Sequence, residues 1–252
     1  MEIKNIEFSY GKNKVLDDIS FKIPDGKVTT IIGANGCGKS TLFNVMTKNL
    51  KPQKGIVILD GKDINTISLK AFAKQAAIVH QYNTAPNDIT VETLVGYGRL
   101  AHRKFAHQDK EEDEKYIERA LKAASLEDLR KCNISELSGG QRQRAWIAMA
   151  LAQNTKILLL DEPTTYLDIK YQIDILRLVR SLNEEYGMTI VMVLHDINQA
   201  AYYSDCIAAM KHGKIIASGT PEEVITTEII SETYGINLNL ERAGGRNFVL
   251  AV

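Results

Sequence analysis

The sequence has few cysteines and no excess of charge of either sign. Its 252 residues include only three cysteines, Cys37, Cys132 and Cys206, which lie far apart and form no C-x-x-C pair. This pattern excludes a zinc ribbon and fits a reducing compartment. Lysine and arginine together number 31, as do aspartate and glutamate, so the formal net charge is +0. No overall basic field therefore points to a nucleic-acid partner.

Long apolar stretches are also missing. No run approaches the ~18 residues that a membrane-spanning helix needs. The first residues, 1–5, hold nothing like the apolar segment of a signal peptide. We therefore expect a soluble, intracellular protein whose link to any membrane goes through a partner. The length of 252 residues allows one large domain, or one domain with an inserted subdomain.

A glycine-rich segment at 33–41 fits the pattern G-x-x-x-x-G-K-[ST] of a phosphate-binding loop. A β-branched run precedes it and apolar residues at helical spacing follow it, which is the strand–loop–helix order that phosphate binding needs. Glycines let backbone N–H groups approach an anion, and a helix N-terminus adds unpaired donors. The candidate nucleotide-binding residues are Gly33, Asn35, Gly36, Cys37, Gly38, Lys39, Ser40 and Thr41. We expect Lys39 to reach the β- and γ-phosphates and the Ser40 hydroxyl to bind Mg²⁺.

Two carboxylates, Asp161 and Glu162, directly follow the apolar run 157–160. At the carboxyl end of a buried parallel strand they would lie where α/β proteins bind their ligands. We expect Asp161 to hold the Mg²⁺ shell, and Glu162 to accept a proton from, or orient, the attacking water. An acidic turn after a core strand is the alternative, but the phosphate loop favours the first interpretation.

The segment 137–141 has the sequence L-S-G-G-Q. Ser138 and Gln141 have the spacing of a capping box, which predicts a helix that begins here and runs to Leu151. Gly139 and Gly140 would let an anion approach that helix end. A capped helix without a ligand is the alternative.

With an L-S-G-G-Q segment between a phosphate loop and such a strand, the chain resembles ATP-binding cassette (ABC) ATPases, from Tyr10 to about Val224. The resemblance implies an α/β fold, with a P-loop (RecA-like) core, an N-terminal antiparallel β subdomain and an inserted α-helical subdomain. We interpret 1–252 as a single nucleotide-binding domain and about 88–155, where the patterns are helical, as the inserted subdomain. The implied activity is hydrolysis of ATP to ADP and phosphate, with ATP and Mg²⁺ as cofactors.

The resemblance also implies roles for four further residues. Tyr10 matches the aromatic that stacks on adenine, although a core aromatic is the simpler interpretation of this residue alone. Gln81 matches the glutamine that contacts Mg²⁺ and water and senses the membrane partner. Asp168 matches the aspartate of the D-loop, and it is also the expected N-cap of the next helix. His195 matches the switch histidine that contacts the γ-phosphate, with a structural histidine as the alternative.

Partners follow from the same resemblance. Two nucleotide-binding domains of this family stack head to tail, so that Ser138, Gly139, Gly140 and Gln141 of one face the ATP on the other. Because the chain has one copy of each motif, we expect it to pair with a second copy of itself. The resemblance further implies polytopic membrane permease subunits, a substrate-binding protein indirectly, and no nucleic acid. It implies a peripheral location at the cytoplasmic face of the cell membrane.

Segments 33–38, 95–99, 141–146 and 161–168 resemble the ATPases of ferric-siderophore and vitamin B12 importers. The ferric-siderophore branch fits best, and haem or cobalamin importers are the alternatives. A non-transport ABC ATPase would usually carry paired cassettes or long coiled-coil insertions, which the sequence lacks. An inactive regulator would not need Lys39, Asp161, Glu162 and His195.

Local patterns predict further elements. We expect an amphipathic helix at 109–124 with Asp109 as its N-cap, and a basic loop at 99–107. A helix is predicted at 169–186, closed by Gly187. After Pro221 we expect a helical and then a polar tail. Because Cys37 lies close to a helix N-terminus, we also expect its thiolate to be favoured and to react with thiol reagents, with a buried loop cysteine that never meets the reagent as the alternative.

Overall fold

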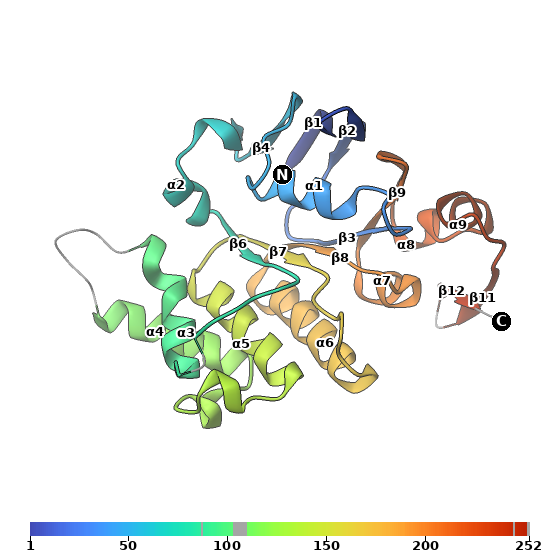
Figure 1. Cartoon of the computed structure of the whole chain (residues 1–252). Coiled ribbons are helices and arrows are strands. Elements are labelled where there is room, and N and C mark those ends of the chain that lie inside the picture. Colours follow the sequence, from blue (N-terminus) through green and yellow to red (C-terminus); the bar gives the residue numbers. More distant parts are fainter. Residues whose placement is uncertain (87, 103–109, 244, 251–252) are drawn as a thin grey trace. The chain divides into compact units, whose positions relative to one another are not determined.

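The computed structural model describes residues 1–86, 88–102, 110–243 and 245–250 (Figure 1). The chain divides into two compact units. The first comprises Met1–Ile67 and Thr189–Val252, and the second comprises Ser68–Met188.

The first unit contains most of the strands. They are β1 (Glu2–Tyr10), β2 (Asn13–Lys22), β3 (Val28–Gly33), β4 (Lys54–Leu59), β5 (Lys62–Asp63), β8 (Thr189–Val193), β9 (Cys206–Lys211), β10 (Lys214–Gly219), β11 (Asn239–Ala243) and β12 (Arg246–Leu250). Its helices are α1 (Lys39–Met46), the 3₁₀ turn η1 (Ile64–Thr66), α7 (Ile197–Tyr203), α8 (Pro221–Val224) and α9 (Thr227–Tyr234).

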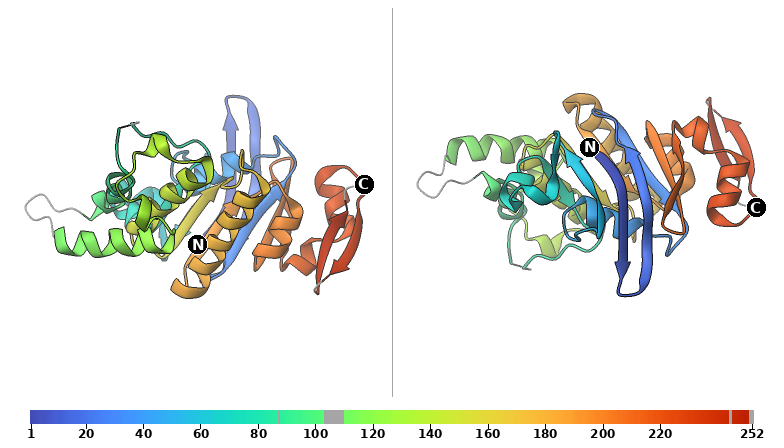
Figure 2. Two further views of the ribbon diagram at one scale, coloured as in Figure 1. Left: turned by 90° about the horizontal axis from the view of Figure 1, so that it is seen from below. Right: turned by 90° about the horizontal axis from the view of Figure 1, so that it is seen from above.

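An antiparallel sheet with the order β2-β1-β4-β5 forms the N-terminal part of this unit. The blue β1–β2 pair is seen lengthwise in Figure 2. Asp60 and Gly61 join β4 to β5 with φ values of 47° and 76°, the left-handed geometry that two-residue hairpin turns require. The predicted antiparallel β subdomain is confirmed.

Parallel strands carry the centre of the first unit. β3 pairs in parallel with β9 on one side and with β8 on the other, and β10 adds to β9 in antiparallel fashion. Every residue of β3 and of β8 is buried. Burial on both faces explains why these strands are continuously apolar or β-branched and show no alternation.

The end of the chain was predicted to be helical and then polar, with no structure assigned to the polar part. α8 and α9 confirm the helical part, but the polar stretch beyond them forms the β11–β12 hairpin, red in Figure 2. The hairpin docks on α7, because the Asn198 amide donates to the Val249 carbonyl over 3.0 Å and accepts from its N–H over 2.8 Å. This stabilisation comes from residues about fifty positions apart, so the local pattern of the tail did not reveal it.

The second unit is mostly helical. Its helices are α2 (Leu69–Ala73), α3 (Val91–Tyr97), α4 (Lys110–Ala123), α5 (Gly139–Ala152) and α6 (Ile169–Tyr186). Its 3₁₀ turns are η2 (Gly98–Ala101), η3 (Glu127–Leu129) and η4 (Ile134–Glu136), and its strands are β6 (Ala76–Val79) and β7 (Ile157–Asp161). β6 and β7 pair in parallel, with Val79 opposite Leu160.

Capping explains where the helices of this unit begin and end. The Asp168 carboxylate accepts from the N–H of Tyr171 at the start of α6, and Gly187 ends that helix with φ 62°. Both ends are as predicted. The Thr90 hydroxyl accepts from the Thr93 N–H, so α3 begins at Val91. The predicted N-cap of α4, Asp109, lies outside the described residues.

Helices α3, α4 and α5 pack against one another, as Figure 1 shows. Arg99, predicted as part of a basic loop, lies in the turn η2 and is a core residue of this cluster with 3% of its surface exposed. Its Nε donates to the Asp113 carboxylate over 2.8 Å, and its guanidinium lies 4.1 Å from the ring centre of Tyr116. The pair neutralises the charge, which permits the burial. Of the predicted loop, 103–107 lies outside the described residues.

Among the helices of the described residues, none combines the length and the apolar character needed to cross a bilayer.

Candidate functional site

The glycine-rich loop joins β3 to α1 in the first unit, as predicted. Gly36 has φ 77°, and a Cβ placed on it would have no neighbouring atom within 4 Å, so the outer side of the loop is open. Gly33 is constrained differently, because its added Cβ would lie 2.4 Å from the Met210 carbonyl oxygen on β9. The first glycine therefore serves the packing of the loop on the sheet, and Gly36 leaves room for an anion.

Lys39 is the first residue of α1 and only 5% exposed. Its Nζ donates to the carbonyls of Gly33 over 2.8 Å and of Ala34 over 3.1 Å. These hydrogen bonds hold the ammonium group against the glycine-rich loop, where it is predicted to reach the phosphates. Ser40, the next residue, is exposed, and Thr41 is partly exposed.

Cys37 does not behave as predicted. It is buried, and a Cβ on Gly33 would lie 2.8 Å from its sulfur. Burial raises the pKa of the Cys37 thiol, and this effect outweighs the opposing effect of Lys39. The expectation of a favoured thiolate is therefore wrong. The helix N-terminus favours charge, but desolvation of a buried sulfur favours the neutral thiol more strongly.

His195 lies at the same edge of the sheet as the glycine-rich loop. β8 and β3 run in parallel with Val193 opposite Ile31, and the Leu194 N–H donates to the Ile31 carbonyl over 3.2 Å. His195 follows directly and is exposed. The next residue, Asp196, caps α7 through the N–H of Gln199.

Tyr10 ends β1 in the first unit and is 53% exposed. Its ring makes an edge contact with Phe8, with 4.9 Å between centroids. More than half of the residue's surface is therefore exposed, which would not hold for a core aromatic and leaves Tyr10 open to a planar partner.

The predicted carboxylates come together with Gln81 in the second unit. Asp161 ends β7 and Glu162 directly follows it, and they are 8% and 9% exposed. The Gln81 Nε2 donates to Glu162 Oε2 over 2.6 Å. Because β6 and β7 are parallel and in register, the residues that follow them meet at one edge.

The Thr165 hydroxyl donates to the same Glu162 Oε2 over 3.1 Å. Sequence reasoning did not identify Thr165, although its place three residues after the glutamate, in the motif shared with importer ATPases, was a usable signal. Glu162 itself has φ 49°, an uncommon conformation for a residue with a side chain. The glutamate is thus held by its backbone turn and by two neutral donors.

The capping box predicted at the start of α5 is present. The Ser138 N–H donates to Gln141 Oε1 over 2.9 Å, and the Gln141 N–H donates to Ser138 Oγ over 3.3 Å. A Cβ on Gly140 would lie 2.4 Å from the Tyr171 ring, so this glycine also permits close packing against α6. Gly139 and Ser138 are exposed.

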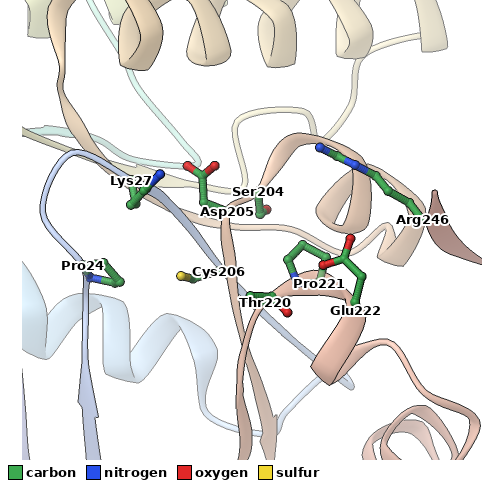
Figure 3. Close-up of a pocket in the computed structure, with 9 residues that line it drawn as sticks. All are labelled: Pro24, Lys27, Ser204, Asp205, Cys206, Thr220, Pro221, Glu222 and Arg246. Carbon is green, nitrogen blue, oxygen red and sulfur yellow. The ribbon is translucent and has the colours of Figure 1, made fainter. Parts of the chain in front are cut away.

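A pocket of about 410 Å³ lies elsewhere in the first unit (Figure 3). It is lined by Pro24, Lys27, Ser204, Asp205, Cys206, Thr220, Pro221, Glu222 and Arg246. These residues surround the beginnings of β3 and β9, whereas Gly33 is at the other end of β3. The Asp205 carboxylate accepts from the Val28 N–H over 2.9 Å, and the Arg246 guanidinium donates to the Ala201 carbonyl over 3.1 Å. These polar groups tie segments together, and the pocket is separate from the glycine-rich loop.

The sequence is similar to known proteins over most of its length. Residues 16–165 match the family described as "ABC transporter". The "Ferric enterobactin transport ATP-binding protein FepC" of Escherichia coli (strain K12) is 46% identical over 233 residues, which are 92% of this chain and 86% of that protein. The "Iron(3+)-hydroxamate import ATP-binding protein FhuC" of Bacillus subtilis (strain 168) is 44% identical over 240 residues, 95% of this chain and 89% of that protein.

The fold is also similar to that of a solved ATP-binding cassette. The dimeric structure of "a post-hydrolysis state of the ATP-binding cassette MJ0796 bound to ADP and Pi" has a TM-score of 0.74 and 32% sequence identity, and covers 87% of this chain and 97% of that one. The glycine-rich loop, the carboxylates after β7 and the capped L-S-G-G-Q helix thus occur in a chain that is similar to ATP-binding cassettes over most of its length. This chain belongs to the ABC transporter family.

Proposed function

We propose that this chain is the ATP-hydrolysing subunit of an importer that takes up iron chelates, with ferric siderophores as the cargo class. The observation that carries the chemical part is the Glu162 carboxylate, which lies at the end of a buried strand and accepts from Gln81 and Thr165. Hydrolysis of a nucleotide needs a bound phosphate and an oriented base for the attacking water. The phosphate loop can supply the first and the Glu162 carboxylate the second.

In this proposal the first unit binds the nucleotide. The backbone of Asn35, Gly36, Cys37 and Gly38 cradles the phosphates together with the N-terminus of α1. Lys39 places its charge on the β- and γ-phosphates, and Thr41 adds a hydroxyl. The exposed ring of Tyr10 supplies a stacking face for adenine.

The residues present also fit a magnesium ion. The Ser40 hydroxyl, the Asp161 carboxylate and the Gln81 amide oxygen are the hard oxygen donors that Mg²⁺ prefers. When bound, Mg²⁺ would neutralise charge on the β- and γ-phosphates.

Hydrolysis then depends on Glu162. Its carboxylate takes a proton from water while the water oxygen attacks the γ-phosphorus and the bond to the β–γ bridging oxygen breaks, which yields ADP and phosphate. Gln81 and Thr165 orient the carboxylate for this step. His195, exposed at the edge where β3 and β8 end, contacts the γ-phosphate.

A second copy completes the site in this proposal. Ser138, Gly139, Gly140 and Gln141 of one protomer face the nucleotide on the phosphate loop of its partner, and Asp168 lies in the same interface. The start of α5 supports this arrangement, because Ser138 and Gly139 are exposed there and a helix N-terminus can accept an anion. The MJ0796 cassette, which is dimeric with ADP and phosphate bound, is similar over 87% of this chain.

The proposed membrane partners are polytopic permease subunits, and a substrate-binding protein acts through them. The chain would then be peripheral, at the cytoplasmic face of the membrane. The cargo class comes from relatives whose names give ferric enterobactin and iron(3+)-hydroxamate as what they transport, over more than nine-tenths of this chain.

The test is uptake in a strain that lacks the gene. Labelled iron offered as an iron–siderophore complex, haem and cobalamin are measured one at a time, after complementation with the wild-type chain or with Glu162→Gln. We expect the deletion to abolish uptake of the iron chelate, the wild type to restore it and the variant to fail. Loss confined to haem or cobalamin would reassign the cargo, and normal uptake of all three would contradict the proposal.

A further inference from the structure

Two tyrosines bridge the loops that carry Gln81 and Glu162. The Tyr82 and Tyr166 hydroxyl oxygens lie 2.8 Å apart, and either can be the donor. The rings are tilted, with 6.2 Å between centroids. Tyr82 directly follows Gln81, and Tyr166 directly follows Thr165. Both tyrosines belong to the second unit.

The two tyrosines are neighbours in the chain of the two residues that donate hydrogen bonds to Glu162. Gln81 donates to Oε2 from one loop, and Thr165 donates to the same oxygen from the other. Each of these donors has one member of the tyrosine pair as its immediate neighbour in the chain. Separation of the hydroxyls would therefore free both loops at the residues that orient the carboxylate.

The backbone around Glu162 needs such support. Glu162 has φ 49° and Tyr166 has φ 65°, left-handed values that are uncommon for residues with a Cβ. Two backbone bonds hold the turn: Thr165 N–H to the Glu162 carbonyl at 3.2 Å, and Leu167 N–H to the Thr164 carbonyl at 3.4 Å. Strained conformations of this kind persist only where neighbouring contacts over-determine them.

Packing does not explain the two rings. Tyr82 is 69% exposed and Tyr166 is 80% exposed, so neither contributes much buried apolar surface. Water competes with an exposed hydrogen bond, so its effect on the site should be moderate.

We infer that the Tyr82–Tyr166 hydroxyl pair is a positioning element for ATP hydrolysis, which fixes the loop of Gln81 to the loop of Glu162. The inference rests on the proposed role of Glu162 as the base. In this inference both tyrosines are positioning residues, which act through the orientation of the carboxylate. Loss of the pair should lower kcat and leave nucleotide binding unchanged.

Three variants of the full chain test this: Tyr82→Phe, Tyr166→Phe and the double variant. Each removes only hydroxyl groups, and Tyr97→Phe, another exposed tyrosine of the same unit, is the matched control. Steady-state phosphate release gives kcat and KM for MgATP, and thermal unfolding gives Tm. We expect kcat to fall three- to tenfold in each single variant, with KM and Tm unchanged. The double variant should equal the singles, because either change breaks the same bond.

Several results would overturn the inference. An unchanged kcat in either single variant would do so, as would losses that multiply in the double variant. A lowered Tm, or a change confined to KM, would assign the pair to folding or to binding. Glu162→Gln, measured beside these variants, distinguishes failure of this inference from failure of the proposed function. If Glu162→Gln is inactive and the tyrosine variants are normal, only this inference fails. If Glu162→Gln hydrolyses ATP at the wild-type rate, the proposed function fails as well.

Discussion

The Gln81 side-chain amide donates to the Glu162 carboxylate, with 2.6 Å between Nε2 and Oε2. The contact joins the ends of two parallel strands in register, β6 and β7. It brings a neutral donor to the group that we propose as the base. A neutral amide orients the carboxylate without removing its charge, and this distinction can be tested.

Gln81→Glu should shift the pH range in which the enzyme hydrolyses ATP to higher values. Two carboxylates at hydrogen-bond distance cannot both be ionised easily, so one of them keeps its proton. The base then becomes active only at higher pH, and the acid limb of the kcat–pH profile should move up by about one pH unit. The profile from pH 5 to 9 is the measurement, with Gln153→Glu as the control. An acid limb that stays in place would mean that Gln81 and Glu162 do not interact during turnover.

Lys39→Ala should weaken nucleotide binding. The Lys39 ammonium group donates to the carbonyls of Gly33 and Ala34. It is therefore the positive charge that lies against the loop proposed to bind the phosphates. We expect the Kd for MgATP to rise at least about tenfold, which corresponds to about 1.4 kcal/mol. Titration with a fluorescent nucleotide measures this. Lys51→Ala, at an exposed lysine beyond α1, should bind as the wild type does, and equal affinity of the two variants would refute the role of Lys39.

Ser138→Arg should prevent ATP-driven dimerisation. The substitution places bulk and charge at the exposed start of α5 and removes a cap, at a cost to stability of about 1 kcal/mol. Light scattering with ATP, on the Glu162→Gln background, compares this variant with Ser138→Ala, which loses the same cap without added bulk. We expect a monomer for Ser138→Arg and a dimer for Ser138→Ala. A dimer with Ser138→Arg would contradict the shared site.

Arg99→Ala should destabilise the fold strongly. Removal of the buried guanidinium leaves Asp113 without its ion pair and the Ala152 carbonyl without a donor at 3.0 Å. We expect the free energy of unfolding to fall by about 3 kcal/mol, because a buried charge loses its partner. Urea denaturation measures it, with exposed Arg177→Ala as the control. A loss below about 1 kcal/mol would show that the ion pair is worth no more than a surface contact.

Local signals in the sequence were sufficient for much of the fold. Asp168 and Gly187 mark the ends of α6 because an N-cap and a left-handed C-cap are properties of single residues. The capping box of Ser138 and Gln141 depends only on their spacing. The phosphate loop was recognisable for the same reason, since strand, glycines and helix are contiguous.

Features that depend on distant residues were missed. The burial of Arg99 requires Asp113 and Tyr116 from another helix, and nothing in the basic run around it reveals them. In the same segment a Cβ on Gly98 would lie 2.1 Å from the Met149 carbonyl oxygen. Residues 98–99, which served as a marker of the importer branch, thus have a packing role in this chain. The prediction of a Cys37 thiolate was wrong because the sequence shows that a helix begins nearby but does not show that the sulfur is buried and desolvated.

Phosphate release by Glu162→Gln, measured together with ATP binding, tests the central claim most directly. The amide has nearly the shape of the carboxylate but cannot take a proton from water. We predict that the variant binds ATP as tightly as the wild type and that its kcat falls at least about a hundredfold. Hydrolysis at the wild-type rate would contradict the assignment of Glu162 as the base, and with it the mechanism proposed for this chain.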